Sequence, residues 1–229
     1  MILWMNVFVT EQRINTANNR YNRGLLRSNT REEIFLYSIA SLGVIPWRKA
    51  ILNIKLDENI DEEQIRYAIL NNFSDCTDLR INFGRNEYQF DWQTQYLREI
   101  SNQTDDCIFF LCNDDHVFLA ENLDYIQKID DLFNKEKPAK HLSCYPSHWP
   151  ELSFMAHEAN GVDEGDFTSF ILRGNCDSCQ FVNKAVLEEW WFGDNYGDKF
   201  LPRSDWFDGS VTPVDMLCFV PKNVELFRH

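Results

Sequence analysis

The chain is short of positive charge, because its 229 residues include 22 Lys and Arg against 36 Asp and Glu. The formal net charge of -14 repels phosphate backbones, so we expect no nucleic-acid partner. Glycine and proline are also scarce, at 9 and 7 residues, which excludes collagen-like and linker compositions. No apolar run reaches the roughly 18 residues that a membrane-spanning helix needs. The apolar start Met1–Met5 lacks the basic and small-residue flanks of a secretory signal, so we expect a soluble, unexported protein with no transmembrane segment.

Cysteine is present without a recognisable pairing pattern. The seven cysteines are odd in number, which favours reduced thiols in a cytoplasmic protein over a disulfide framework. Cys176 and Cys179 form a single CxxC motif, whereas a zinc site needs four ligands, so we interpret these thiols as core packing. A glycine-rich phosphate loop is also missing after the first apolar run, which disfavours a sugar nucleotidyltransferase.

What the sequence does contain is 44% hydrophobic residues, enough for a core without staples. In the first half, strand and helix patterns alternate. Thr30 and Glu33 form a capping box for a helix over about 31–42 that Gly43 ends, and Asp61 with Gln64 caps a second helix. The predicted strands are 7–9, 50–56, 79–82 and 107–112, with a third helix from Asp91. This alternation predicts an α/β fold with a Rossmann-like, mainly parallel sheet flanked by helices.

The second half is less regular. A helix carrying Leu123, Ile126, Ile129 and Phe133 is followed by short strand-like pieces. We place these at 141–145, 152–156, 167–172 and 180–182, with a helix over 183–191. We find no linker and predict one domain over 1–229, with a nucleotide-binding half at 1–118 and a smaller, mixed half at 119–229.

Two adjacent carboxylates, Asp114 and Asp115, follow the most apolar strand in the chain. Like charges at a strand end repel each other and are costly to desolvate, so they face water, a hydroxyl donor or a cation. Their hard oxygen ligands suit Mn2+ or Mg2+, and such an ion bridges nucleotide phosphates. The alternative is a solvated turn in which an aspartate caps the next helix.

The order of elements, together with the segment Ile108-Phe109-Phe110-Leu111-Cys112-Asn113-Asp114-Asp115-His116-Val117-Phe118, resembles the GT-A nucleotide-sugar glycosyltransferases, most of all the inverting family 2. In that family an apolar strand leads into a DxD-type motif. The resemblance implies that Asp115 ligates the metal and that Asp114 shares it or binds the ribose. Asn113 stands where the family has its first aspartate, which leaves the ligation open.

The same resemblance implies that 1–118 is the nucleotide-sugar-binding half and 119–229 the acceptor-binding half. It also implies a donor site at the ends of the first two strands. Asp57 matches the acidic residue that reads the base, and Thr10, Glu11 and Arg13 occupy the position of the donor loop. They stand in place of the family's usual Pro-x-Tyr-Asn. We also expect Arg13 and Arg203 to offset the negative field near the phosphates.

For the general base, the resemblance implies an Asp or Glu at a helix start in the second half. We select Asp205, with Trp206 beside it as an apolar platform for a sugar ring, and Trp149 as a second acceptor-binding candidate. A helix N-cap is the alternative role for Asp205. Rival bases are Asp163, Glu164 and Asp166, which we interpret as an acidic loop whose flexibility suits a lid.

Two histidines complete the candidate site. Some GT-A enzymes take a third metal ligand from a histidine near the C-terminus, which here is His229; the alternative is a frayed terminal residue. We expect His116 to face solvent or to cap the next helix, with a phosphate contact as the other interpretation.

Together these features predict a metal-dependent glycosyltransferase, and the resemblance implies an inverting mechanism. The donor is a UDP- or GDP-linked sugar, the acceptor a glycan or lipid-linked molecule, and the cofactor Mn2+ or Mg2+. The cytoplasmic location leaves room for a peripheral membrane contact. The competing hypothesis is a non-catalytic nucleotide-binding or scaffold protein built on the same sheet.

Overall fold

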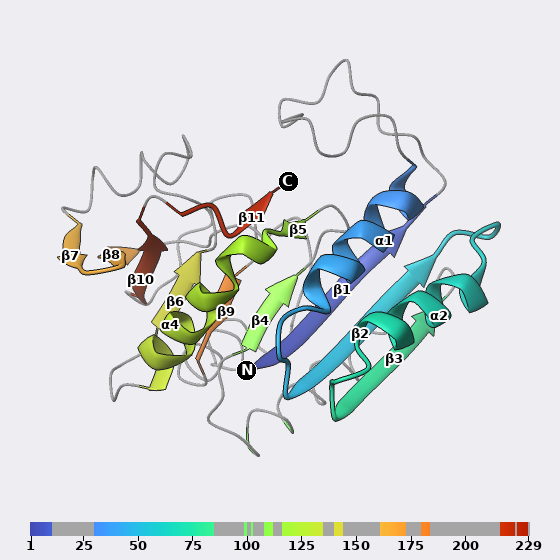
Figure 1. Cartoon of the computed structure of the whole chain (residues 1–229), viewed down its shortest axis with the longest axis horizontal. Coiled ribbons are helices and arrows are strands. Elements are labelled where there is room, and N and C mark those ends of the chain that lie inside the picture. The colour runs from blue at the N-terminus through green and yellow to red at the C-terminus, as the bar shows by residue number, and fades with distance from the viewer. Residues whose placement is uncertain are drawn as a thin grey trace, which may run out of the picture. The chain divides into compact units, whose positions relative to one another are not determined.

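The structure is a computed structural model, and its described residues form two compact units. Unit 1 comprises Met1–Tyr88, Leu111–Leu123 and Phe227–His229, and unit 2 comprises Gln89–Phe110 and Asp124–Leu226 (Figure 1). No helix in the described part of the chain is long and apolar enough to cross a membrane. The described residues are 1–10, 30–84, 99, 102, 108–111, 116–134, 140–143, 161–172, 180–183, 216–222 and 224–228.

Unit 1 contains the regular strand-helix alternation. Three parallel strands, β1 (Ile2–Val9), β2 (Lys49–Leu56) and β3 (Asp78–Gly84), pair with β2 in the middle. Helices α1 (Arg31–Leu42) and α2 (Glu62–Asn72) connect them. Figure 1 shows both helices in front of the three strands, as expected when two right-handed crossovers step in the same direction across a sheet.

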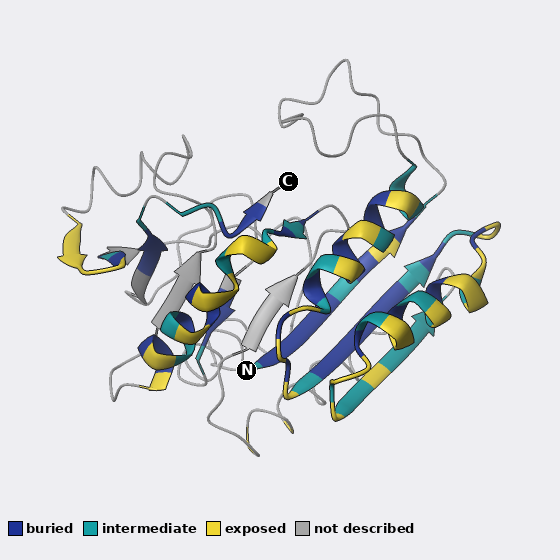
Figure 2. Cartoon of the chain, viewed as in Figure 1, coloured by how far each residue is buried: buried dark blue, intermediate teal, exposed yellow. Residues whose placement is uncertain are grey.

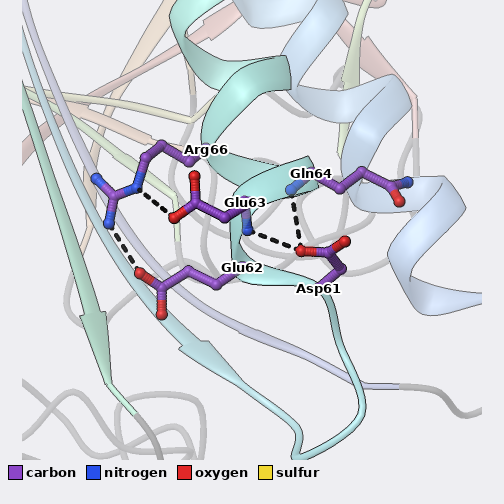
Figure 3. A network of polar contacts seen from close by, with 5 residues as sticks. All are labelled: Asp61, Glu62, Glu63, Gln64 and Arg66. Carbon is purple, nitrogen blue, oxygen red and sulfur yellow. Dashed lines mark hydrogen bonds and ion pairs between the residues drawn. The ribbon is translucent and has the colours of Figure 1, made fainter.

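Side-chain caps start both helices where the sequence predicts them. Thr30 accepts a hydrogen bond from Glu33 N at 3.2 Å, while the Glu33 carboxylate accepts from Thr30 N at 2.9 Å. Asp61 accepts from Glu63 N and Gln64 N at the start of α2, and Arg66 pairs with Glu62 one turn later (Figure 3). These bonds satisfy amide groups that have no partner within the helix.

The first strand is longer than predicted, because the apolar start of the chain is part of it. Ile2, Leu3, Trp4 and Met5 have no solvent exposure, and these consecutive residues point to alternate faces of the sheet. Both faces of β1 are therefore buried, as Figure 2 shows in dark blue. Burial on both faces explains why the strand opens with the apolar run Ile2–Met5, without alternation of apolar and polar residues.

A row of asparagines crosses the sheet of unit 1. Asn6, Asn53 and Asn82 are in register on β1, β2 and β3, and a side-chain hydrogen bond of 2.8 Å joins each neighbouring pair. Asn53 is 6% exposed, so its amide group depends on these partners. A shift of one residue would break both bonds, and the row therefore fixes the strand register.

Unit 2 is a mixed sheet with one described helix, α4 (Leu123–Asn134). Its strand order is β4-β9-β6-β10-β8-β7, in which β6 and β10 are parallel and the other neighbouring strands are antiparallel. The strands are β4 (Ile108–Leu111), β6 (Lys140–Ser143), β7 (Val162–Glu164), β8 (Phe167–Leu172), β9 (Gln180–Val182) and β10 (Met216–Pro221). The α/β class, with a parallel region and a mixed region, is confirmed.

Aromatic residues build the core of unit 2. Phe167 of β8 packs edge-on against Tyr125 of α4 and Phe219 of β10, with ring centroids 5.4 and 6.3 Å away. Phe133 of α4 contacts Phe181 of β9 at 6.4 Å. The predicted inner face of α4 is confirmed at Ile126, Ile129 and Phe133, whereas Leu123 is 40% exposed.

The pairing direction of β4 with β9 and the presence of several short strands differ from expectation. Strand β4 has the apolar sequence of a central parallel strand, but it pairs antiparallel with β9, because such a sequence reports burial on both faces and not direction. The sequence also gave no sign of β7, β10, β5 (Val117–Phe118) or β11 (Phe227–Arg228). Most of the helix predicted from Asp91, the strand at 152–156 and the helix after Asn183 fall outside the described residues.

Candidate functional site

The carboxyl edge of the unit 1 sheet brings two predicted site residues together. Val9 and Leu56 are partners at the ends of β1 and β2, so Thr10 and Asp57 are the first residues beyond the two neighbouring strands. Asp57 N donates to Val9 O at 3.0 Å, which extends the ladder by one bond. Neighbouring strands lie about 4.8 Å apart, so both residues belong to one small area at the strand ends.

The turn after β2 holds the Asp57 backbone in place. Ile60 N donates to Asp57 O at 3.2 Å, and the Ile60 side chain is buried. One oxygen of the half-buried Asp57 carboxylate accepts from Glu58 N at 3.1 Å. Among the described residues, no Lys or Arg pairs with this carboxylate. Asp57 can therefore accept a hydrogen bond from a ligand without first giving up an ion pair.

The chain on either side of the acidic motif is described, although the motif itself is not. After it, β5 pairs antiparallel with β11, so that Val117 is opposite Arg228 and Phe118 opposite Phe227. The rings of Phe118 and Phe227 have centroids 5.4 Å apart and are 2% and 3% exposed. Phe227 and Arg228 are thus held beside β5, a strand that begins two residues after Asp115 in the sequence. The residue that follows Arg228 is His229.

His116 is fully buried, so the expectation that it faces solvent is wrong. Its carbonyl oxygen accepts a hydrogen bond of 2.6 Å from Ser38 Oγ of α1, which is also fully buried. The sequence suggested exposure because His116 follows two aspartates, but its neighbour on the other side begins a strand. Burial of His116 and Phe118 makes this segment part of the unit 1 core.

The three rival carboxylates of unit 2 belong to a hairpin and not to a flexible loop. Strands β7 and β8 are joined by a two-residue turn, Gly165-Asp166, in which Gly165 has φ of 77° as primed hairpin turns require. Asp163 forms an ion pair with Lys222, and Asp166 one of 3.0 Å with Lys128. Glu164 accepts from Ser169 Oγ at 2.9 Å. The segment that the sequence predicts as an acidic loop is therefore a β-hairpin with bonded carboxylates.

Electrostatics makes Asp163 a poor candidate for the general base. The hydrogen bond from Lys222, helped by Gly165 N, lowers the pKa of Asp163. A lower pKa weakens a carboxylate as a proton acceptor, whereas catalytic bases have raised values. Burial, with the charge of Asp166, raises the pKa of Tyr125 to about 12, so its hydroxyl stays protonated and donates to Asp166 O.

The remaining predicted site residues lie outside the described residues. They are Glu11, Arg13, Asn113, Asp114, Asp115, Trp149, Arg203, Asp205, Trp206 and His229. Within the described ranges, no group of three or more His, Cys, Asp or Glu side chains is arranged to hold a metal ion. The metal, catalytic and acceptor roles therefore stay predictions.

No protein-family model and no curated protein sequence matches the chain. Among solved structures, the chain is similar to residues 1–349 of S. aureus TarS in complex with UDP, at 11% identity and a TM-score of 0.45. That match covers 99% of this chain and 60% of the TarS chain. Mouse xyloside xylosyltransferase 1, in its apo form, matches at 12% identity and a TM-score of 0.35, covering 82% of this chain and 69% of the mouse chain. At such scores neither likeness decides an activity.

Proposed function

We propose that the chain is a metal-dependent glycosyltransferase that moves a sugar from a nucleoside diphosphate to a glycan or lipid-linked acceptor, with inversion. Asp115 and Asp114 hold Mn2+ or Mg2+ with His229 as the third ligand, and Asp57 with Thr10 contacts the nucleoside. Asp205 is the general base, while Trp206 and Trp149 line the acceptor side.

The pairing of β5 with β11 is the observation that carries this proposal. It anchors Arg228 opposite Val117, so that the backbone leading to His229 runs beside the backbone leading away from Asp115. The two carboxylates and the imidazole are far apart in sequence, and this pairing supports their meeting. Carboxylate oxygens and a neutral imidazole nitrogen form a donor set that suits Mn2+ and also accepts Mg2+.

The bound cation would supply positive charge against the leaving diphosphate. The chain's own residues do the rest of the work in this proposal. Asp57 accepts a hydrogen bond from the base, and its lack of an ion pair among the described residues leaves it suited to that role. Asp205 removes the proton of the acceptor hydroxyl. Asp163 and Asp166, its rivals, are paired with lysines.

Nucleotide binding tests the proposal most directly. Thermal unfolding would be followed with UDP, the nucleotide in the TarS complex, and with GDP, each with Mn2+ or with EDTA. One nucleotide should stabilise the protein only when Mn2+ is present; at a hundred times its Kd the gain is about 2.7 kcal/mol. Stabilisation that ignores EDTA would contradict the metal role, and no response to either nucleotide would favour the non-catalytic hypothesis.

Two substitutions assign the roles. Asp115→Ala should remove the Mn2+-dependent response while leaving the unfolding temperature of the free protein unchanged, and Asp163→Ala is the matched control that keeps the response. Asp205→Asn should keep nucleotide affinity and lower turnover by roughly two to four orders of magnitude, the range for loss of a general base. Unchanged turnover in Asp205→Asn would assign the base to another residue.

A further inference from the structure

Two serines of α1 bond to the backbone that directly follows the acidic motif. Ser38 Oγ donates to His116 O at 2.6 Å, and Phe118 N donates to Ser41 Oγ at 2.9 Å. The Ser41 hydroxyl also donates to Ser38 O at 2.8 Å, one turn back in the helix. The hydroxyl of Ser41 is thus used as donor and acceptor at once.

These contacts hold one edge of β5. Residues two apart in a strand direct their backbone N–H and C=O groups to the same edge, so His116 O and Phe118 N both address α1. Val117, between them, is in register with Arg228 of β11 on the other edge. A strand of two residues is therefore held by side chains on one edge and by a second strand on the other.

The two hydrogen bonds of Ser38 and Ser41 to this backbone, here called the serine grip, fix the orientation of β5 as well as its distance from α1. They involve one acceptor and one donor on the strand, two residues apart, so sliding the strand along α1 or rotating it breaks at least one bond. Serine is a modest helix former, because its hydroxyl competes for backbone hydrogen bonds. Helix stability therefore does not explain the presence of either serine in α1. Ser38 has no solvent exposure, which removes water as a substitute partner.

We propose that Ser38 and Ser41 are positioning residues that set the orientation of the acidic motif through His116–Phe118. Asp115 is joined to His116 by a peptide bond, so the hydrogen bond from Ser38 acts on the residue to which the acidic motif is attached. This inference rests on the proposed function, because it assigns the orientation to metal binding by Asp114 and Asp115. Neither serine touches substrate or metal.

Ser41→Ala, Ser41→Thr and Ser38→Ala test the proposal, with Ile69→Val as the control. Alanine is the better helix former and Ser41 is half-buried, so Ser41→Ala will fold. Ser41→Thr keeps the hydroxyl. Ile69 of α2 is fully buried and the loss of one methyl there lowers stability without touching β5. Hydrogen exchange of the Phe118 amide measures the strength of the serine grip, and titration of Mn2+ at saturating UDP measures the affinity of the metal site.

Ser41→Ala should speed exchange at the Phe118 amide and weaken Mn2+ affinity about tenfold, as residues that orient metal ligands do. Ser38→Ala should change affinity in the same direction, whereas Ser41→Thr and Ile69→Val should keep the affinity of the original chain. Faster exchange with unchanged Mn2+ affinity in Ser41→Ala would overturn the positioning role, as would unchanged exchange. If the unsubstituted chain binds no Mn2+ with either UDP or GDP, both the proposed function and the positioning role of the serines fail. The exchange data then still report whether the two serine hydrogen bonds hold β5.

Discussion

Asp57 of unit 1 and the two aspartates of the unit 2 hairpin stand in opposite electrostatic settings. In unit 1, Asp57 stands at the end of a parallel strand, half-buried, and its carboxylate accepts one backbone bond and has no cationic partner among the described residues. In unit 2, Asp163 and Asp166 flank a hairpin turn and pair with Lys222 and Lys128. A carboxylate that is already neutralised serves the fold, whereas one held in place without a counter-ion can serve a ligand. This difference supports the proposal that Asp57, and not Asp163 or Asp166, contacts a ligand.

The largest expected effects come from replacing two buried phenylalanines, one in each unit, which should differ in their effect on the Mn2+ response. Phe227→Ala removes the ring that packs on Phe118 behind β5, and Phe167→Ala removes the ring between Tyr125 and Phe219. Each should cost about 3–5 kcal/mol of unfolding free energy in urea titrations, because a buried ring leaves a cavity. Only Phe227→Ala should also abolish Mn2+-dependent stabilisation by nucleotide.

Phe227→Leu is the companion variant, since it keeps an apolar side chain and should retain part of the Mn2+ response. If Phe167→Ala removes that response as completely as Phe227→Ala does, the metal site does not depend on the β5–β11 pairing in particular, and the comparison of the units fails on this point.

Two glycines give the next effect, for different physical reasons. A Cβ on Gly43 would lie 2.3 Å from Asn72 O of α2, so Gly43→Ala should cost about 1–3 kcal/mol through overpacking. Gly165 in the hairpin turn has open space but φ of 77°, so Gly165→Ala should cost about 1–2 kcal/mol through backbone strain. Asparagine discriminates the causes: Gly165→Asn should recover most of the loss, since Asn adopts this conformation, and Gly43→Asn should recover none.

Much of unit 1 could be predicted from sequence because its signals are local. The Thr30–Glu33 box and Asp61 lie next to the helices that they start, and β1 and β2 contain apolar runs. The interpretation of Gly43 as a helix end is confirmed, but its close approach to Asn72 depends on how two helices pack. Local chemistry therefore predicts where an element begins and ends better than it predicts what the element touches.

The missed features depend on contacts between residues far apart in the sequence. Strands β5 and β11 have two residues each and are separated by more than a hundred positions, so neither forms a recognisable pattern alone. Ser38 and Ser41 were placed within a predicted helix, and the available signal was two hydroxyls one turn apart beside its buried face. Asp163 lies in a sequence rich in acidic residues, and its lysine partner is contributed by the end of β10, a strand that the sequence did not reveal.

A smaller effect concerns ligand affinity and compares Asp57 with Asp163. Asp57→Ala removes a charged acceptor from the proposed nucleoside site, which should weaken binding of the responsive nucleotide about tenfold or more, as loss of a charge-assisted hydrogen bond does. Asp163→Ala should leave that affinity unchanged. Calorimetric titration in the presence of Mn2+ measures both. If Asp57→Ala binds the nucleotide as tightly as the original chain does, Asp57 is not part of the donor site. If Asp57→Ala and Asp163→Ala weaken binding to the same extent, the distinction between the two units fails.

The smallest effect is the acid sensitivity of two ion pairs. Lys49 donates to Asp78 at 2.8 Å in unit 1 and lowers the pKa of that carboxyl, as Lys222 does for Asp163 in unit 2. An aspartate with a lowered folded pKa contributes stability above its unfolded pKa of about 3.9, and this contribution is lost as the pH falls through the folded value. The Asp78 side chain is 45% exposed and that of Asp163 79%, so solvent screens the unit 2 pair more strongly.

Asp78→Asn should therefore lower stability at pH 7 by roughly 0.2–1 kcal/mol, the range for exposed pairs, and Asp163→Asn by less. The difference between each variant and the original chain should shrink as the pH falls below the unfolded pKa of about 3.9, and it should vanish below the lowered pKa of the folded chain, where the carboxyl is protonated in both states. Urea midpoints measured from pH 7 to pH 2 report this convergence. A loss that persists at pH 2 would mean that the carboxylate acts through packing and not through its charge. A larger loss in Asp163→Asn at pH 7 would mean that the hairpin, despite its exposure, is the more strongly coupled of the two pairs.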